Sequence, residues 1–385
     1  MSNILILHNS LDYNKSGVER VSFLLKKELN SRGYNCYEGC AKGENLNHKE
    51  DIFEYNFNDS KQNVLTDLTA FVDKYHIQII IIQGLFDPNI NNAVLHLKKN
   101  CACKIIFCLH NAPSAYARKL PLSFLDQVKI LIWYLIKFHI IIFDYRTHRL
   151  KMLTEIFDIA DRFILLSAAY IKEIGRITKK QDLNKIVCIN NPVTFQKPCV
   201  NFSQKKKQVL ILSRLEDFQK NISESLRIWK LIEDSGHCDW KLLIVGSGTD
   251  EKKLKDYAKE INLKNYAFIG ETSEPEKFYS ESSIFMMTSH IEGWPMTLLE
   301  AQQYGCIPIV YNTFAALSEI IEKNVNGFII EKYNKEVFAK TTIELIDNVS
   351  TRKKIAQNCI EICKKYSSNV IGDKWDSLLK TLPTD

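Results

Sequence analysis

The stretch Glu292-Gly-Trp-Pro-Met-Thr-Leu-Leu-Glu300 places two carboxylates around the expected start of a helix. An apolar run at 284–287 precedes it, as in a buried strand, and the helix is expected to continue to Gly305. Pro295 suits the first helical position, because a missing N–H costs nothing there. The amides of that turn can then face an anion, while the acids accept hydrogen bonds from hydroxyls. This combination predicts a ligand that carries both phosphate and hydroxyls, such as a nucleotide sugar.

Short apolar runs alternate with helical patterns on both sides of this stretch. A continuous apolar run bounded by polar loops is typical of a parallel strand buried on both faces. Alternation of such strands with helices predicts an α/β fold with two doubly wound, Rossmann-like domains that face each other across a cleft. The expected strands are 4–7, 77–82, 104–109, 162–166 and 186–189 in the first half, and 209–212, 240–245, 267–269, 284–287 and 307–310 in the second.

The length of 385 residues exceeds what a single hydrophobic core usually supports. We expect a first domain over residues 1–195 and a second over 208–365, joined by a polar linker at 196–207. Residues 366–385 are expected to form a C-terminal helix that packs back on the first domain.

The net charge of +6 is concentrated in the first half of the chain, where residues 1–199 hold 26 Lys and Arg against 19 Asp and Glu, a balance of +7. Within that half, residues 119–151 are very apolar and are interrupted by Lys and Arg. The apolar run is shorter than the ~20 residues that a membrane span needs. Apolar residues mixed with cations favour a helical insertion at a membrane interface. A helix packed on the core with solvated cations is the alternative.

The eleven cysteines are scattered, and no signal-peptide pattern precedes the first expected strand. Scattered cysteines in apolar surroundings favour reduced, buried thiols. We therefore expect a cytoplasmic protein, peripheral at the inner face of the cell membrane, that binds no nucleic acid.

Four consecutive strand ends in the second half carry residues suited to a ligand. Ligands of open α/β sheets bind beyond the carboxyl ends of the strands, so these residues are expected to share one site. Arg214 can bind phosphate in a forked geometry, and Lys220 adds a point charge. The other strand ends carry Gly246 and Gly248, which permit close backbone approach, then Glu271, and finally Glu292.

The second half resembles the glycosyl transferase group 1 enzymes, or glycosyltransferase family 4, which have the GT-B fold. The residues that carry the match are Ser213-Arg214-Leu, Gln219-Lys220-Asn221, Val245-Gly-Ser-Gly248, Phe268-Ile-Gly270, Glu292 to Ala301, Gly305-Cys-Ile-Pro308 and Asn326-Gly-Phe328. The first half matches more loosely, through Ser16-Gly17-Val-Glu-Arg, His110, residues 160–167 and Asn190-Asn-Pro192. Ser16 stands where the family usually has the first of two adjacent glycines.

The resemblance implies a role for each matching residue. Arg214 and Lys220 would hold the donor diphosphate and stabilise the charge that builds on it as the sugar leaves. Glu292 would contact hydroxyls of the donor sugar, and Glu300 would contact the ribose. His110 would lie near the reacting sugar. The implied catalytic residues are thus Glu292, His110, Arg214 and Lys220.

The remaining implied donor contacts surround this set. Gly17 would approach the diphosphate from the first domain, and Glu271 would lie near the nucleobase. The backbone around Trp294, Pro295, Met296 and Thr297 would support sugar and phosphate. No bound metal and no other cofactor is implied.

The resulting prediction is a retaining hexosyl- or N-acetylhexosaminyltransferase. It would move a sugar from a UDP-sugar to a glycan acceptor, undecaprenyl-linked or otherwise held on a lipid, in the synthesis of capsule, O-antigen or another surface polysaccharide. Two alternatives stay open: a UDP-sugar 2-epimerase of the same fold, and a non-enzymatic subunit that binds nucleotide sugars in an assembly complex.

Overall fold

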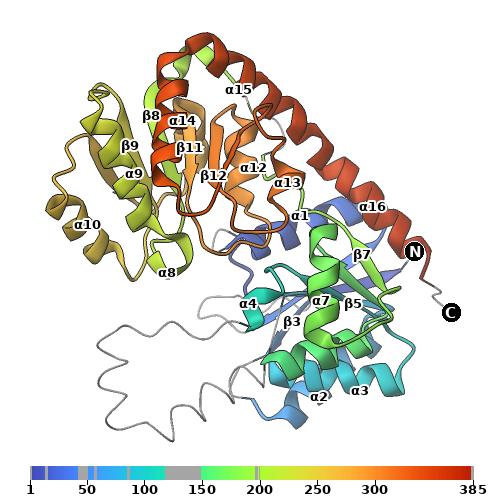
Figure 1. Cartoon of the computed structure of the whole chain (residues 1–385). Helices are drawn as coiled ribbons and strands as arrows, with labels where there is room; N and C mark the ends of the chain where they lie inside the picture. The colour runs from blue at the N-terminus through green and yellow to red at the C-terminus, as the bar shows by residue number, and fades with distance from the viewer. Residues whose placement is uncertain are drawn as a thin grey trace, which may run out of the picture. The chain divides into compact units, whose positions relative to one another are not determined.

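The chain divides into two compact units, drawn in Figure 1. The computed structural model describes residues 2–13, 16–41, 51–55, 59–84, 87–117, 149–195, 198 and 200–382. Met1–Pro192 and Ser368–Asp385 form the first unit, and Val193–Ser367 form the second. The second unit thus begins earlier than residue 208, and the segment expected as a linker lies within it.

The last two residues of the expected linker, Lys206 and Lys207, belong to a strand and are exposed at its start. Strand β8 (Lys206–Leu212) begins with Lys206 and Lys207, whose ammonium groups pair with Glu281 and Asp239. Because these first residues are polar, the apolar pattern of the sequence did not indicate where the strand begins.

A seven-stranded parallel sheet forms the centre of the first unit, in the order β3-β2-β1-β4-β5-β6-β7. Its strands are β1 (Asn3–Leu7), β2 (Asn35–Ala41), β3 (Ile52–Tyr55), β4 (Ile79–Gln83), β5 (Lys104–Leu109), β6 (Arg162–Leu165) and β7 (Ile186–Cys188). The helices include α1 (Gly17–Ser31), α2 (Lys61–Lys74), α3 (Pro88–Asn100), α4 (Ser114–Ala117), α7 (Ile171–Thr178) and α16 (Ser368–Lys380). Strands β2 and β3 were not predicted, because polar residues interrupt their apolar pattern.

A six-stranded parallel sheet forms the centre of the second unit, in the order β10-β9-β8-β11-β12-β13. After β8, its strands are β9 (Lys241–Val245), β10 (Tyr266–Gly270), β11 (Ser282–Met287), β12 (Ile307–Tyr311) and β13 (Phe328–Ile330). Its helices are α8 (Asp217–Lys220), α9 (Ile222–Asp234), α10 (Glu251–Glu260), α11 (Pro275–Glu281), α12 (Met296–Gln303), α13 (Leu317–Ile320), α14 (Lys335–Asp347) and α15 (Val349–Cys363). Because β8 pairs with both β9 and β11, the strand order reverses at β8, and the adjoining strand ends form a switch point where α/β sheets bind ligands.

The C-terminal helix α16 packs on α1 in the first unit (Figure 1). Ile371 and Trp375 of α16 share one buried apolar cluster with Leu25 and Leu29 of α1. Gly372 permits the close approach, since a Cβ there would lie 2.5 Å from the side chain of Glu28. The last helix in the sequence therefore completes the core of the first domain.

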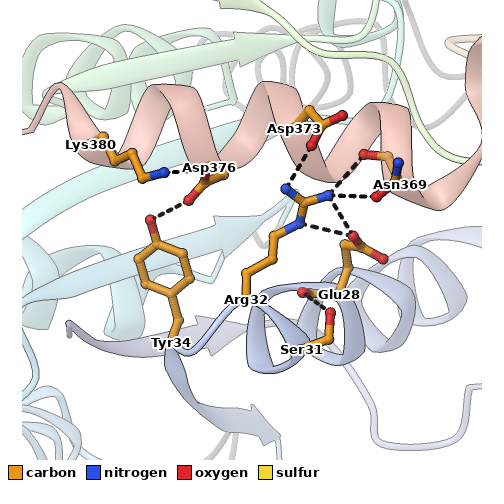
Figure 2. Close-up of polar contacts among 8 residues, drawn as sticks. All are labelled: Glu28, Ser31, Arg32, Tyr34, Asn369, Asp373, Asp376 and Lys380. Carbon is orange, nitrogen blue, oxygen red and sulfur yellow. Dashed lines mark hydrogen bonds and ion pairs between the residues drawn. The ribbon is translucent and has the colours of Figure 1, made fainter.

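Figure 2 shows a polar network along the same contact. The Arg32 guanidinium donates to Asp373 at 2.7 Å and to Glu28 at 2.9 Å. The hydroxyl of Tyr34 donates to Asp376 at 2.9 Å. The network joins the same two helices, α1 and α16, as the apolar cluster does.

The basic apolar insertion expected at 119–151 lies outside the described residues, apart from its last three. Within the described ranges, the structure contains no helix with the length and apolar character to cross a bilayer.

Candidate functional site

The loops after β8, β9, β10 and β11 meet at one edge of the second sheet, because all four strands run parallel. These loops carry most of the site residues predicted from the sequence. The structure therefore brings together Arg214, Lys220, Gly246, Gly248, Glu271, Glu292 and the start of α12 on one sheet edge. Gly17 and His110 belong to the first unit.

Lys220 and Glu292 form the central ion pair of this edge. The ammonium of Lys220 lies 2.8 Å from Oε1 of Glu292, and the two side chains are only 15% and 8% exposed. Coulomb attraction is stronger in such a partly dry environment than in water. The pair holds a cation and an acceptor side by side, which suits a ligand with phosphate next to hydroxyls.

Asn221 connects the loops that carry this pair. Its backbone is left-handed (φ +52°), a conformation that Asn tolerates better than most residues. Its side chain donates to the carbonyl of Thr288 at 3.1 Å, and its own carbonyl accepts from the Thr288 hydroxyl at 2.8 Å. These reciprocal bonds join the end of α8 to the end of β11, and so fix Lys220 beside Glu292.

Arg214 is held much more loosely. Its side chain is 60% exposed, and its guanidinium lies 2.8 Å from Glu216 and donates to Gln219 at 3.1 Å. An exposed ion pair of this kind contributes only ~0–1 kcal/mol. The side chain can therefore leave Glu216 for a phosphate at little cost.

Gly246 and Gly248 are needed for close packing within the protein, and their approach to a ligand stays a prediction. A Cβ on Gly246 (φ +131°) would lie 1.9 Å from the carbonyl oxygen of Ser213, and one on Gly248 would lie 2.5 Å from that of Leu215. The two loops are also joined by a hydrogen bond from Leu215 N to the carbonyl of Ser247, 2.8 Å long. The glycines thus position the loop that carries Arg214.

Glu271 follows β10 and is exposed at the same edge. One carboxylate oxygen accepts from the hydroxyl of Ser247 at 3.2 Å. This bond joins the loop after β10 to the loop after β9 and holds Glu271 beside the other predicted residues.

Helix α12 begins at Met296, one residue later than predicted, and Pro295 is its N-cap. The ψ of Pro295 is 109°, so its backbone is extended rather than helical. Trp294 is 4% exposed and packs edge-on against Tyr366, with ring centroids 5.3 Å apart. Its indole N–H has no hydrogen-bond partner within the described part of the chain.

Glu300 lies in the second turn of α12, buried to 2% exposure. Its Oε1 accepts from the hydroxyl of Thr194 at 2.5 Å, and its Oε2 accepts from the hydroxyl of Tyr279 at 2.8 Å. Two hydrogen bonds from neutral donors compensate the burial of this carboxylate.

In the first unit, Gly17 is the first residue of α1, and Ser16 caps that helix by accepting from Val18 N at 3.3 Å. His110 follows β5, is buried, and contacts Oε1 of Gln83 through Nε2 at 2.6 Å. Burial lowers the pKa of His110 to about 4. Because Oε1 is an acceptor, Nε2 carries the proton, and Nδ1 is an acceptor with no partner among the described residues.

Sequence reasoning missed several side chains that contact the predicted residues, among them Thr194, Tyr279 and Gln83. Thr194 lies two residues after the Asn190-Asn-Pro192 motif, and Gln83 directly follows the expected strand 77–82, so sequence position offered only a weak signal. Tyr279 lies in α11 among charged residues, where nothing local marks it as a partner of Glu300.

The two-sheet architecture is the GT-B fold, as solved structures show. Sucrose-phosphate synthase from Thermosynechococcus elongatus superposes with a TM-score of 0.77 at 14% identity, over 99% of this chain and 98% of that one. A mutant of TarM from S. aureus, in complex with fondaparinux, alpha-GlcNAc-glycerol and UDP, superposes with a TM-score of 0.75 at 15% identity, over 99% and 100%. The prediction of two Rossmann-like domains is confirmed.

Residues 193–361 match the model of the family described as glycosyl transferases group 1, and the second domain of this chain belongs to that family. The amylovoran biosynthesis glycosyltransferase AmsD of Erwinia amylovora is 33% identical over 46% of this chain and 49% of that protein. The poly(glycerol-phosphate) alpha-glucosyltransferase of Bacillus subtilis is 29% identical over 48% and 28%. The chain thus spans about half or less of the length of these two relatives.

Proposed function

We propose that this protein is a retaining glycosyltransferase that moves a sugar from a UDP-linked donor to a glycan acceptor. The observation that carries the proposal is the buried Lys220–Glu292 pair at the strand-order switch point of a glycosyl transferase group 1 domain. The solved structures of TarM and of HepE from Anabaena, similar in fold, contain UDP. Retention rests on the family resemblance.

The chemistry proposed for this site needs a stabilised leaving group. The bond between C1 of the sugar and the diphosphate breaks as the acceptor oxygen bonds to C1, and negative charge builds on the diphosphate, which can take the acceptor's proton. Arg214 and Lys220 stabilise that charge electrostatically. When Lys220 turns toward phosphate, Glu292 accepts hydrogen bonds from the sugar hydroxyls.

His110 contributes as a neutral group. With its pKa lowered to about 4, the imidazole is uncharged at neutral pH, and Nδ1 can accept a hydrogen bond from a substrate hydroxyl.

The acceptor is proposed to be a surface-polysaccharide intermediate, since AmsD is named for amylovoran biosynthesis and another relative, from Campylobacter jejuni, for a GalNAc-containing diNAcBac-PP-undecaprenol glycan. A lipid-linked acceptor would place the protein at the inner membrane face, where its basic first half favours anionic lipid. We also propose that transfer needs no metal, because the two cations neutralise the diphosphate. Transfer that is abolished by EDTA and restored by Mg²⁺ would contradict this.

The decisive experiment is a screen of UDP- and GDP-sugars by thermal shift, followed by calorimetry and by product analysis. A donor that binds the folded state raises the melting temperature. Glu300→Ala should weaken UDP binding, whereas Glu292→Ala should impair transfer more than UDP binding. Absence of binding to every nucleotide sugar would overturn the proposal, and epimerised product from donor alone would favour the 2-epimerase.

A further inference from the structure

Residues 193–195 follow the passage of the chain from the first unit to the second, and they are attached to α12 and to the 3-10 turn Lys364–Tyr366 that follows α15. Val193 N donates to the carbonyl of Tyr366 at 2.8 Å. Phe195 N donates to Oε1 of Gln303 at 3.2 Å, and Nε2 of Gln303 donates back to the carbonyl of Phe195. These backbone contacts keep the segment in place without any help from the Thr194 side chain.

The hydroxyl of Thr194 makes a different contact, to the carboxylate of Glu300. With Tyr279 on the other oxygen, Glu300 receives one donor on each side, at 2.5 Å and 2.8 Å. Tyr279 is fully buried, and Glu300 is 2% exposed, so the carboxylate has little freedom to rotate.

We infer that Thr194 is a positioning residue that orients Glu300 toward the two hydroxyls of the donor ribose. A planar carboxylate can meet two neighbouring hydroxyls only when its plane is fixed, and a hydrogen bond on each oxygen fixes that plane. The inference rests on the proposed function, because it assumes that Glu300 contacts ribose.

The test measures binding of two probes by calorimetry: UDP, and 2′,3′-dideoxy-UDP, which lacks both ribose hydroxyls. Thr194→Val removes the hydroxyl and keeps the side-chain shape. It should weaken UDP binding by roughly tenfold. Binding of 2′,3′-dideoxy-UDP should stay within about twofold of wild type, because that probe offers no hydroxyl to orient. Thr194→Ser should restore UDP binding.

Thr313→Val is the matched control. Thr313 is also half-buried in the second unit, and its hydroxyl donates to the carbonyl of Ser289 at 2.6 Å rather than to Glu300. This variant should bind both probes as wild type does. A purely structural role for Thr194 would weaken both probes alike.

Three results would overturn the inference: unchanged UDP binding in Thr194→Val, an equal loss for the two probes, or no recovery in Thr194→Ser. Wild-type protein that fails to bind UDP would instead remove the assumption of a UDP donor site, and the inference would fall with it. The two failures are therefore distinguishable.

Discussion

Each unit contains a buried glutamate beside a lysine, but the two pairs occupy different places in their sheets. In the first unit, Lys26 donates to Glu38 at 2.7 Å, and Glu38 lies within β2, in register with Ile6 of β1. In the second unit, Lys220 donates to Glu292 at 2.8 Å, beyond the carboxyl end of β11. The same chemistry therefore stabilises a sheet in one unit and lies where ligands bind in the other.

The surroundings of Glu38 support its structural role. Tyr13 donates to its two oxygens at 3.1 and 3.2 Å, and Nε2 of His8 lies 3.5 Å away. Burial opposes ionisation, but the contacts of Glu38 with His8 and Lys26 outweigh it and lower the pKa of Glu38 to about 2. Groups from the loop after β1 and from α1 thus converge on one carboxylate. Location relative to the strand ends, rather than residue type, separates the two pairs.

The largest effect is expected when each of the two Lys–Glu pairs is broken in its own variant. Lys26→Met and Lys220→Met each leave a buried carboxylate without its cation, which should destabilise the folded protein by about 3 kcal/mol. Lys220→Met should also reduce sugar transfer by roughly 10²–10³-fold, because diphosphate charge loses a stabilising group. Denaturant unfolding and transfer kinetics measure the two effects. If both variants lost the same sugar-transfer activity per folded molecule, the Lys26–Glu38 pair would not be purely structural, and the comparison would be wrong.

A second prediction concerns the loops that hold the second-unit site together. Gly246→Ala should destabilise the protein by about 3 kcal/mol, because the new Cβ would clash with the Ser213 carbonyl in a left-handed backbone. Gly236→Ala is the control: its φ is +95°, but nothing lies within 4 Å of the added atom. Unfolding by denaturant should show a clearly smaller loss for the control. Similar losses would mean that backbone strain alone explains both.

A third prediction uses pH to sharpen the description of the first unit. The unfolded chain protonates His110 near pH 6.5, whereas the folded protein does so only near pH 4, so the unfolded state binds more protons between these values. Stability should therefore fall by roughly 3 kcal/mol as the pH drops from 6.5 to 4. His110→Gln should remove this slope. The contribution of Glu38 is lost lower, as the pH falls from 4.5 toward 2. An unchanged slope between pH 6.5 and 4 in His110→Gln would contradict the assignment.

The smallest effect is expected at the α1–α16 network in Figure 2. Asp373 is 62% exposed, so its pair with Arg32 is largely screened by solvent. Arg32→Met should lower stability by only about 1 kcal/mol, whereas Trp375→Ala, at 5% exposure, should cost about 3–5 kcal/mol. Thermal unfolding of both variants tests whether apolar packing or the polar network holds α16.

Most of the second-unit strands could be predicted from the sequence, because a short continuous apolar run bounded by polar loops, such as Ile284 to Met287, is typical of a strand buried on both faces. The first unit was predicted less completely. In β2, Glu38 and Gly39 break the apolar pattern, since Glu38 is neutralised by partners distant in sequence and Gly39 leaves room for Leu7 and Phe53. No local pattern reveals such compensation.

The sequence by itself determined the alternation of buried strands and helices, and with it which residues stand at strand ends. It could not determine which partners those residues meet. Lys220 meets Glu292 because β8 lies next to β11, Glu300 meets Thr194 because the chain enters the second unit beside α12, and α16 packs on α1 near the start of the chain. The apolar periodicity of a segment reflects only whether that segment is buried. Which residues become its partners depends on the order of the strands and on where the chain passes between the units, and only the tertiary structure decides these.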